Sequence, residues 1–386
     1  MKKNKKQKAS EVASYYGFSL IETPTINKGD IQKIKSLLQD ETPHLPRRQA
    51  GRGCYFADLP EKMVAVLRFY EEKNMANLPQ PVMLCSRNRP DGKYLNLEIL
   101  GCAKAISEAT IIQTALAILR EQGYRDLYVN INSLGERESA NRFFRELSNF
   151  CHKHSEALPV DCRLAVKRDI SEFFHCHGEK FQTLLEEAPK SVAFLSELAK
   201  IHFKEVLEYL EALDIPYRIN NTLLGIHQFV THTIFEIRDL KSEKDDNALA
   251  FGFRYNAVAR KIGMKKEIPA ISVAVAVKKT SGHKSTATKA KKPKVFFAQI
   301  GTEAKLKSLK IIEMLRQARV DICQTLSKDK MSSQIAVAEN LKAPYLIIMG
   351  QKEALEEAVI VRNMLNRSQK IVPIPKLADY IKHLKG

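Results

Sequence analysis

Hydrophobic and polar positions along the chain follow two rhythms, one typical of helices and one of strands. Apolar residues recur at helical spacing in 57–74, where Pro60 marks the start of the helix. The same spacing returns in 107–122, and Gly123 ends that helix. Three further segments rich in β-branched residues predict strands: 126–134, 233–240 and 268–277. The last of these is apolar throughout, so we expect it to be buried on both faces.

The N-terminal third adds a helix–strand unit and a hairpin. Residues 9–26 predict a helix that passes through Gly17 into a strand ended by Pro24. Residues 85–101 predict two strands joined by a basic turn. The turn carries Arg87, Arg89 and Lys93 around Pro90-Asp91-Gly92, a layout that suits a clamp for polyphosphate and equally a solvated turn. The second strand, however, is apolar at Leu95, Leu97, Ile99 and Leu100.

The last hundred residues form a separate unit in which strands and helices alternate. Its predicted strands are 294–301, 321–327, 344–350 and 358–365, and its predicted helices are 302–320 and 330–343. This order predicts an α/β layer with a largely parallel sheet. Between the predicted strands 126–134 and 233–240, from about 135 to 217, the sequence is helical and polar.

Charge changes this picture more than overall composition does. With 386 residues, 44% apolar and 27% charged, the chain has the make-up of a globular protein of two or three domains. Its net charge of +18 instead indicates a polyanionic partner, most often nucleic acid, or an anionic membrane surface. No apolar run reaches the roughly 18 residues that a membrane span needs. The basic start lacks the apolar core of a signal peptide, so we expect a cytoplasmic protein.

Lysines concentrate just before the C-terminal unit. Seven of them lie between 278 and 294, with no acid and mostly Ser, Thr and Ala in between. This composition predicts a mobile linker and a domain boundary. Its last lysines are candidates for binding a nucleic-acid backbone: Lys289, Lys291, Lys292 and Lys294. The alternative is a solubilising tether that binds no partner.

The cysteines and histidines allow a weaker hypothesis. Seven cysteines, an odd count, indicate reduced thiols rather than a disulfide framework. The groups at 151–154 and 175–177, together with Cys162, offer ligands that suit zinc, but no Cys-x-x-Cys pair is present among them. We therefore predict no metal, with histidines on helix surfaces and cysteines in the core.

The order of these segments resembles a class II aminoacyl-tRNA synthetase of the histidyl type over nearly the whole chain. The hairpin 85–101 resembles the second class motif, and 268–279 lies where the third belongs. Residues 214–237 resemble the stretch before and through the histidine-binding signature, and 250–263 the Gly-Gly-Arg-Tyr-Asp segment. The terminal α/β unit resembles the anticodon-binding domain.

The resemblance implies an antiparallel sheet core with helices, followed by an α/β anticodon-binding-type domain. The expected divisions are a basic tail 1–10, a catalytic-type domain 11–279 with a helical insertion at about 136–215, a lysine-rich linker 280–294, and an anticodon-binding-like domain 295–386. It also implies a homodimer built on the first class motif, whose place here is 15–26.

The catalytic positions depart from the family. Residues expected to contact ATP or histidine are replaced at Ser86, Leu95, Ile99, Ala103, Leu224 and Lys279. Possible remnants of the ligand pocket are Glu61, Arg89, Arg254 and Tyr255, although the last two also suit packing alone. A leucine cannot replace an arginine on a phosphate.

The sequence thus predicts a catalytically inactive or strongly impaired synthetase-like protein that binds tRNA or another RNA and needs no cofactor. The alternative is an active histidine–tRNA ligase with a rearranged site, which would use ATP and magnesium. A pocket filled by Leu95, Ile99, Ala103 and Leu224 would favour the inactive protein.

Overall fold

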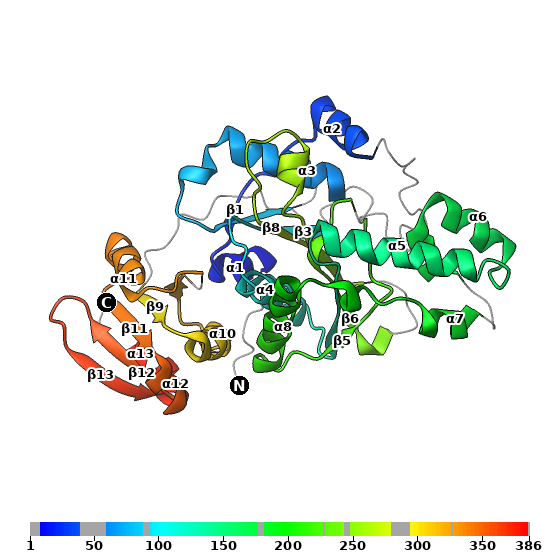
Figure 1. The fold of residues 1–386 in the computed structure, drawn as a ribbon. Coiled ribbons are helices and arrows are strands. Elements are labelled where there is room, and N and C mark those ends of the chain that lie inside the picture. The colour runs from blue at the N-terminus through cyan, green and yellow to red at the C-terminus, as the bar shows by residue number, and fades with distance from the viewer. Residues whose placement is uncertain are drawn as a thin grey trace.

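Two sheets organise the chain, which Figure 1 shows as two bodies side by side. The computed structural model describes residues 8–38, 59–87, 93–176, 181–226, 228–242, 248–278, 294–325 and 327–384. The larger sheet has eight strands in the order β1-β2-β3-β8-β7-β6-β4-β5, and the C-terminal sheet has five. An α/β chain with two such sheets is the predicted fold class.

The larger sheet is mainly antiparallel, as predicted. Its strands are β1 (Ser19–Leu20), β2 (Val82–Arg87), β3 (Tyr94–Leu100), β4 (Leu127–Ser133), β5 (Tyr217–Ile219), β6 (Thr231–Asp239), β7 (Ala250–Arg254) and β8 (Ala270–Ala276). Only the β1–β2 and β4–β5 pairs are parallel. The buried strand expected at 268–277 is β8, at the centre between β3 and β7.

Alternating side chains give this sheet two buried faces. On β3, Leu95 and Ile99 pack in the cluster formed with α1 (Ala9–Tyr15), α4 (Ile106–Glu121) and α8 (Glu197–Ala212). We call this side the α4 face. Leu84 and Phe253 pack in the other cluster, with α2 (Lys28–Leu38), α3 (Leu59–Glu72) and α9 (Val258–Lys261), and this side is the α3 face. Helix α2 was not predicted from the sequence.

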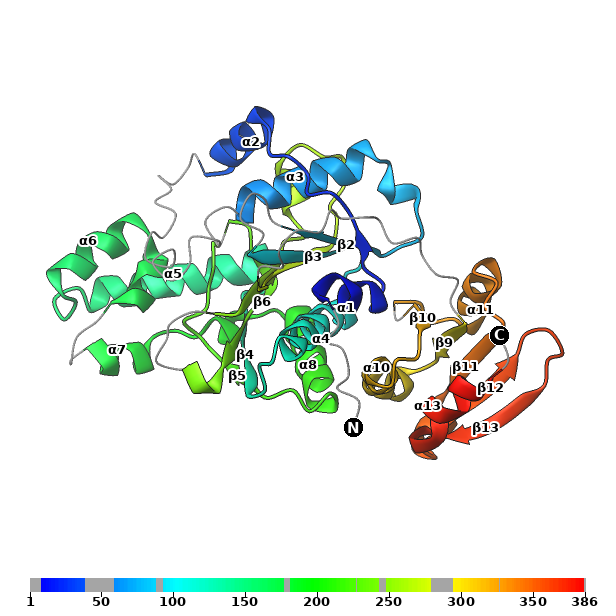
Figure 2. The ribbon, with the colours of Figure 1, turned by 180° about the vertical axis from the view of Figure 1, so that it is seen from behind.

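The predicted helical insertion, apart from α8, extends from the end of the sheet that lies away from the C-terminal unit (Figures 1 and 2). It contains α5 (Arg137–Lys153), α6 (Val160–Arg168), η4 (Ile170–His175), α7 (Phe181–Glu187) and η5 (Ser191–Phe194). Cys162 and Cys176 form a disulfide in it, with their Cα atoms 5.7 Å apart. The expectation of reduced thiols is therefore wrong for this pair, because packing of α6 on η4 brings together two cysteines that a residue count cannot pair.

The C-terminal unit combines a parallel core with an antiparallel edge. Its elements are β9 (Val295–Gln299), α10 (Thr302–Gln317), β10 (Ile322–Gln324), α11 (Met331–Asn340), β11 (Tyr345–Met349), α12 (Gln351–Leu355), β12 (Ala358–Asn363), β13 (Gln369–Pro373) and α13 (Ile374–His383). Strands β10, β9 and β11 are parallel, whereas β12 and β13 are antiparallel neighbours. The sequence predicted the first five of these elements and β12, but not α12, β13 or α13.

Buried polar contacts hold the C-terminal unit against the larger body. Gln113 of α4 donates from Nε2 to the carbonyl oxygen of Leu309 in α10 at 2.8 Å. Arg316 of α10 lies 2.9 Å from Glu121 of α4. The Tyr15 hydroxyl of α1 donates to two carbonyl oxygens of the C-terminal unit at 3.0 and 3.2 Å. Separating the two parts would exchange these hydrogen bonds for bonds to water, at a net cost of roughly 0.5–1.5 kcal/mol for each bond.

Candidate functional site

The α3 face carries a closed polar cluster on its central strands. Glu98 of β3 is buried, at 5% exposure, and its two carboxylate oxygens each accept a hydrogen bond. The Tyr255 hydroxyl, just beyond β7, donates to Oε2 at 2.7 Å. The Ser272 hydroxyl of β8 donates to Oε1 at 2.7 Å. Each member of the cluster therefore binds another member.

Burial controls the protonation of this cluster. It raises the pKa of Glu98 to about 7, although the bonds from Tyr255 and Ser272 act in the opposite direction. Burial, together with the nearby Glu98 carboxylate, raises the pKa of Tyr255 well above its usual value. Tyr255 thus remains a neutral donor, and Glu98 changes charge near neutral pH.

This shift predicts a dependence of stability on pH. Between pH 4.5 and 7 the unfolded chain has lost the Glu98 proton while the folded protein still holds it. Glu98 therefore lowers the free energy of unfolding as pH rises through this window, by up to roughly 3 kcal/mol. Glu98→Gln should match the wild type at pH 4.5 and be the more stable protein at pH 8, because its amide never ionises. Chemical denaturation at a series of pH values measures the difference.

The comparison with wild type matters because a second buried group opposes Glu98. Burial, then the charges of His202 and Arg254, lower the pKa of His232 to about 4. The free energy of unfolding therefore increases through His232 as pH rises from 4 to 6.5, the direction opposite to that of Glu98. The pH curve of the wild type alone would combine the two effects. Glu138→Gln, a change on the exposed side of α5, is the matched control. Equal curves for Glu98→Gln and wild type would contradict the prediction.

On the α4 face, Arg254 belongs to a buried ion pair. Its side chain is 0% exposed, and Nε donates to Oε1 of Glu108 at 2.7 Å while Nη1 donates to the carbonyl of Cys102 at 2.9 Å. His202 Nε2 lies 2.8 Å from the same Glu108 oxygen. Burial alone would raise the pKa of Glu108, but Arg254 and His202 outweigh it and lower this pKa to about 2. Arg254 thus compensates a buried carboxylate, a structural task.

The altered family positions do not line one pocket. Leu95 and Ile99 are buried on the α4 face, whereas Leu224 is buried on the α3 face with Tyr255. Ala103 lies beyond β3 and is exposed. The sheet therefore separates the residues that the sequence predicted to fill a single space.

Some of the other predicted site residues lie in the described ranges of the chain, and some lie outside them. Ser86 is buried on β2 opposite Asn96 of β3, and Glu61 lies in the first turn of α3. Lys294 donates from Nζ to the carbonyl of Leu384 at 2.5 Å, so it joins the two ends of the C-terminal unit. Five predicted residues lie outside the described ranges: Arg89, Lys279, Lys289, Lys291 and Lys292.

Sequence reasoning missed Glu98 and Glu108, and gave Ser272 only as the replacement of a family glycine. A signal did exist for Glu98, because an acid in the middle of an apolar strand needs buried partners. Glu108 lies within a largely apolar helix and gives a similar signal. As for metals, the described ranges contain no group of three or more metal-ligating side chains, and the disulfide occupies two cysteines of the predicted set.

Comparison with known proteins gives the following relationships. The family model for the anticodon binding domain matches residues 294–384. A histidine–tRNA ligase of Dehalococcoides mccartyi is 25% identical, with 98% of this chain and 94% of the relative covered. That of Halothermothrix orenii is 27% identical, over 84% of this chain and 81% of the relative. The solved structure of apo S. aureus histidyl-tRNA synthetase is 20% identical, with 97% and 93% covered and a TM-score of 0.49.

The antiparallel-rich sheet core and the C-terminal anticodon binding domain define the architecture of a class II aminoacyl-tRNA synthetase. The chain is thus similar over most of its length to histidine–tRNA ligases, and residues 294–384 match the anticodon binding domain. In the part of the chain that the structure describes, no helix is long and apolar enough to cross a membrane.

Proposed function

We propose that this protein is catalytically inactive or strongly impaired as a synthetase and binds tRNA or another RNA. The closed cluster of Glu98, Tyr255 and Ser272 is the observation that carries the proposal. These side chains bind one another, so they offer no free group to an amino acid or to ATP. Ser86 and Leu224, which replace family arginines, are buried and uncharged. Amino-acid activation needs cations on the phosphates of ATP.

RNA binding is supported by charge and by the anticodon binding domain. The net charge of +18 favours a polyanionic partner. Exposed basic side chains gather on β13, α13 and the turn before β13: Arg367, Lys370, Lys376 and Lys382. Such residues bind phosphates without reading bases. We place this activity in the cytoplasm, where tRNA is used.

The alternative is an active histidine–tRNA ligase. It is favoured by the names of the relatives, which match this chain over nearly their whole length. This enzyme would have to supply phosphate cations from positions other than Ser86 and Leu224. The substrates would then be histidine, ATP with magnesium, and tRNA.

Two measurements on the full-length protein test the proposal. ATP–pyrophosphate exchange with each amino acid should stay at background, whereas filter binding should retain tRNA on the protein. Exchange with histidine at a rate usual for synthetases would establish the ligase instead. Absence of both activities would refute the RNA-binding half of the proposal.

A homodimer is part of the same proposal, and the fold limits where its interface can lie. Tyr15 and Tyr16 of the first-motif segment contact α10 of their own chain. Ser19, Glu22 and Ile26 remain exposed on the same segment. A partner would therefore bind along 19–26 rather than against the tyrosines. Light scattering with size-exclusion chromatography should give twice the mass of 43.8 kDa, and a monomeric mass would contradict the dimer.

A further inference from the structure

A cavity lies at the edge of the large sheet, away from the Glu98 cluster. Its volume is about 370 Å³, and it lies between β5 and the segment 185–190 at the end of α7. Strand β5 is the last in the sheet order, and β4 and β6 separate it from the three strands that hold the Glu98 cluster. The cavity is thus a different place from the family's expected pocket. Its volume is within the roughly 300–1,000 Å³ usual for small-ligand sites.

The wall of the cavity combines flat apolar surface with side-chain amides. Phe174 and Pro189 contribute apolar surface, and Asn130, Asn220 and Asn221 contribute amides. Asn130 Nδ2 donates to Glu236 at 2.8 Å, which fixes the direction of its amide. An apolar wall with a few oriented polar groups is the usual composition of a ligand site.

The oxygen of one of these amides lacks a partner among the described residues. The Oδ1 atom of Asn221 is buried, and no hydrogen-bond partner for it exists among the described residues. By contrast, the neighbouring Asn220 Oδ1 accepts two bonds from Thr222, at 3.0 and 2.8 Å. A buried acceptor without a partner costs about 1–3 kcal/mol, so a donor on a ligand or a bound water would relieve it.

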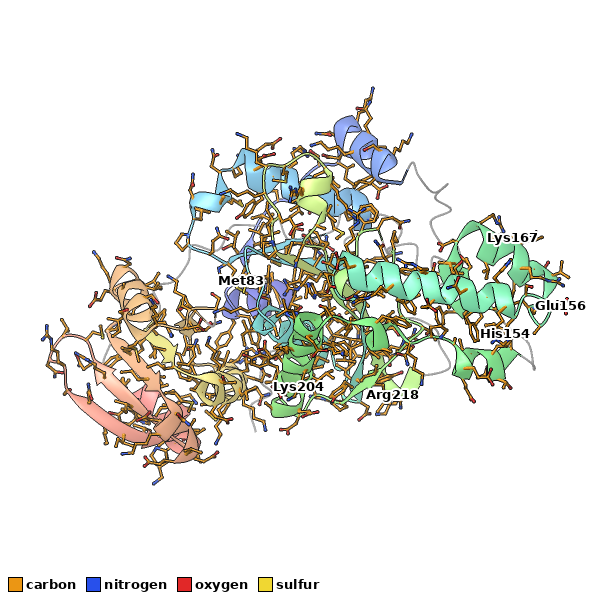
Figure 3. The ribbon with its side chains drawn as sticks, in the orientation of Figure 1. Met83, His154, Glu156, Lys167, Lys204 and Arg218 are labelled. Carbon is orange, nitrogen blue, oxygen red and sulfur yellow. A yellow bond between two sulfur atoms is a disulfide. The ribbon has the colours of Figure 1, made fainter. Side chains whose placement is uncertain are left out.

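Two cations and one acid line the cavity. Lys190 and Arg218 are exposed at its wall and carry positive charge. Glu186, also exposed there, carries the opposite charge. The guanidinium of Arg218, labelled in Figure 3, lies 4.6 Å from the centre of the Tyr128 ring, which fixes its position. The excess of one positive charge favours an anionic ligand.

We propose that this cavity binds a nucleoside monophosphate group, free or at an unpaired end of RNA. The phosphate pairs with Lys190 and Arg218, the base lies against Phe174 and Pro189, and a base or ribose donor bonds to Asn221. Phosphate, flat ring and donor together match the three kinds of group in the wall. The choice of a nucleotide over other anions rests on the proposed RNA-binding function.

The test is calorimetric titration of the full-length protein with AMP, GMP, CMP and UMP, each beside its nucleoside. At least one nucleotide should bind saturably below about 1 mM, and its nucleoside about tenfold or more weaker. Lys190→Gln and Asn221→Ala should each weaken binding about tenfold. Lys204→Gln, a change at an exposed position of α8 that Figure 3 also labels, is the matched control and should change nothing.

Asn221→Ala separates a ligand role from a structural one. Removing an unpartnered buried oxygen should leave the thermal midpoint of the free protein unchanged or raised, while nucleotide binding falls. A lowered midpoint with unchanged binding would show a structural residue and overturn the assignment. So would the failure of all four nucleotides to bind.

Competition with RNA identifies the source of the nucleotide. Displacement of the bound nucleotide by intact tRNA, but not by tRNA trimmed of its unpaired 3′ end, assigns the site to RNA. Binding without such displacement assigns it to a free nucleotide. Retention of tRNA on filters without any mononucleotide binding would overturn this site and leave the proposed function standing. Mononucleotide binding without retention of tRNA would refute only the RNA-binding function.

Discussion

Restoring one arginine, Ser86→Arg, should leave ATP–pyrophosphate exchange with histidine at the background of the wild-type protein. Loss of a single charge-stabilising donor typically lowers turnover by about 10²–10³-fold. In this chain Leu224 also replaces a family arginine, and Ile99 and Ala103 replace further ligand-contacting residues. Groups that act as a unit do not contribute additively, so a single repair recovers almost nothing.

The geometry adds a second reason for this outcome. Ser86 is buried at 3% exposure opposite Asn96, in a layer already filled by the Glu98 cluster and Leu84. An arginine placed there must displace packed side chains before it can reach a phosphate. Circular dichroism and thermal unfolding of the variant are required, because an unfolded variant would say nothing about the site.

A matched variant keeps the experiment informative if Ser86→Arg fails to fold. Leu224→Arg repairs a second arginine position, and the double variant repairs these two while Leu95 still replaces a third. All three should remain inactive while a histidine–tRNA ligase assayed beside them exchanges normally. Adenylate formation by either single variant would show that the remaining site is intact, and the protein would then be an enzyme one substitution away from activity.

Local patterns predicted most elements, because these elements satisfy their own hydrogen bonds and present one apolar face. The helix 107–122 and the strand 126–134 became α4 and β4 within one or two residues. Short or polar elements were missed, as α2 and β13 show, since they depend on the surfaces that they cover. The residue limits of the domains and of the linker stay predictions.

The candidate site was harder to predict because face assignment depends on strand register. A strand with apolar residues on both faces gives no period-2 signal, and a shift by one residue moves every side chain to the other side. Leu95 and Ile99 were expected beside Leu224, but β3 directs them to the α4 face. Arg254 and Tyr255 are adjacent in sequence and end on opposite faces for the same reason.

Replacing Lys289, Lys291 and Lys292 with Gln should weaken the binding of all RNAs to a similar degree. The surrounding sequence contains no acid that could neutralise these lysines. Lysines there bind phosphates and release counterions without reading bases. The magnitude of the slope of log affinity against log salt should fall by about 0.7–0.9 per lysine, so by roughly 2–3 for the triple variant.

Lys294 provides the matched control, because its Nζ already donates to the carbonyl of Leu384. Lys294→Gln alone should lower the thermal midpoint of the protein and change the salt slope by well under the roughly 0.7–0.9 of a lysine that binds a phosphate. If Lys294 also neutralises a phosphate, the variant with all four lysines changed should lower the magnitude of the slope by about 3. If it does not, the fall should equal that of the triple variant. Filter binding of tRNA at several salt concentrations measures these slopes. An unchanged slope in the triple variant would show that the linker is a tether that binds no RNA. The charge of +18 would then act through other surfaces, such as the exposed lysines of β13 and α13.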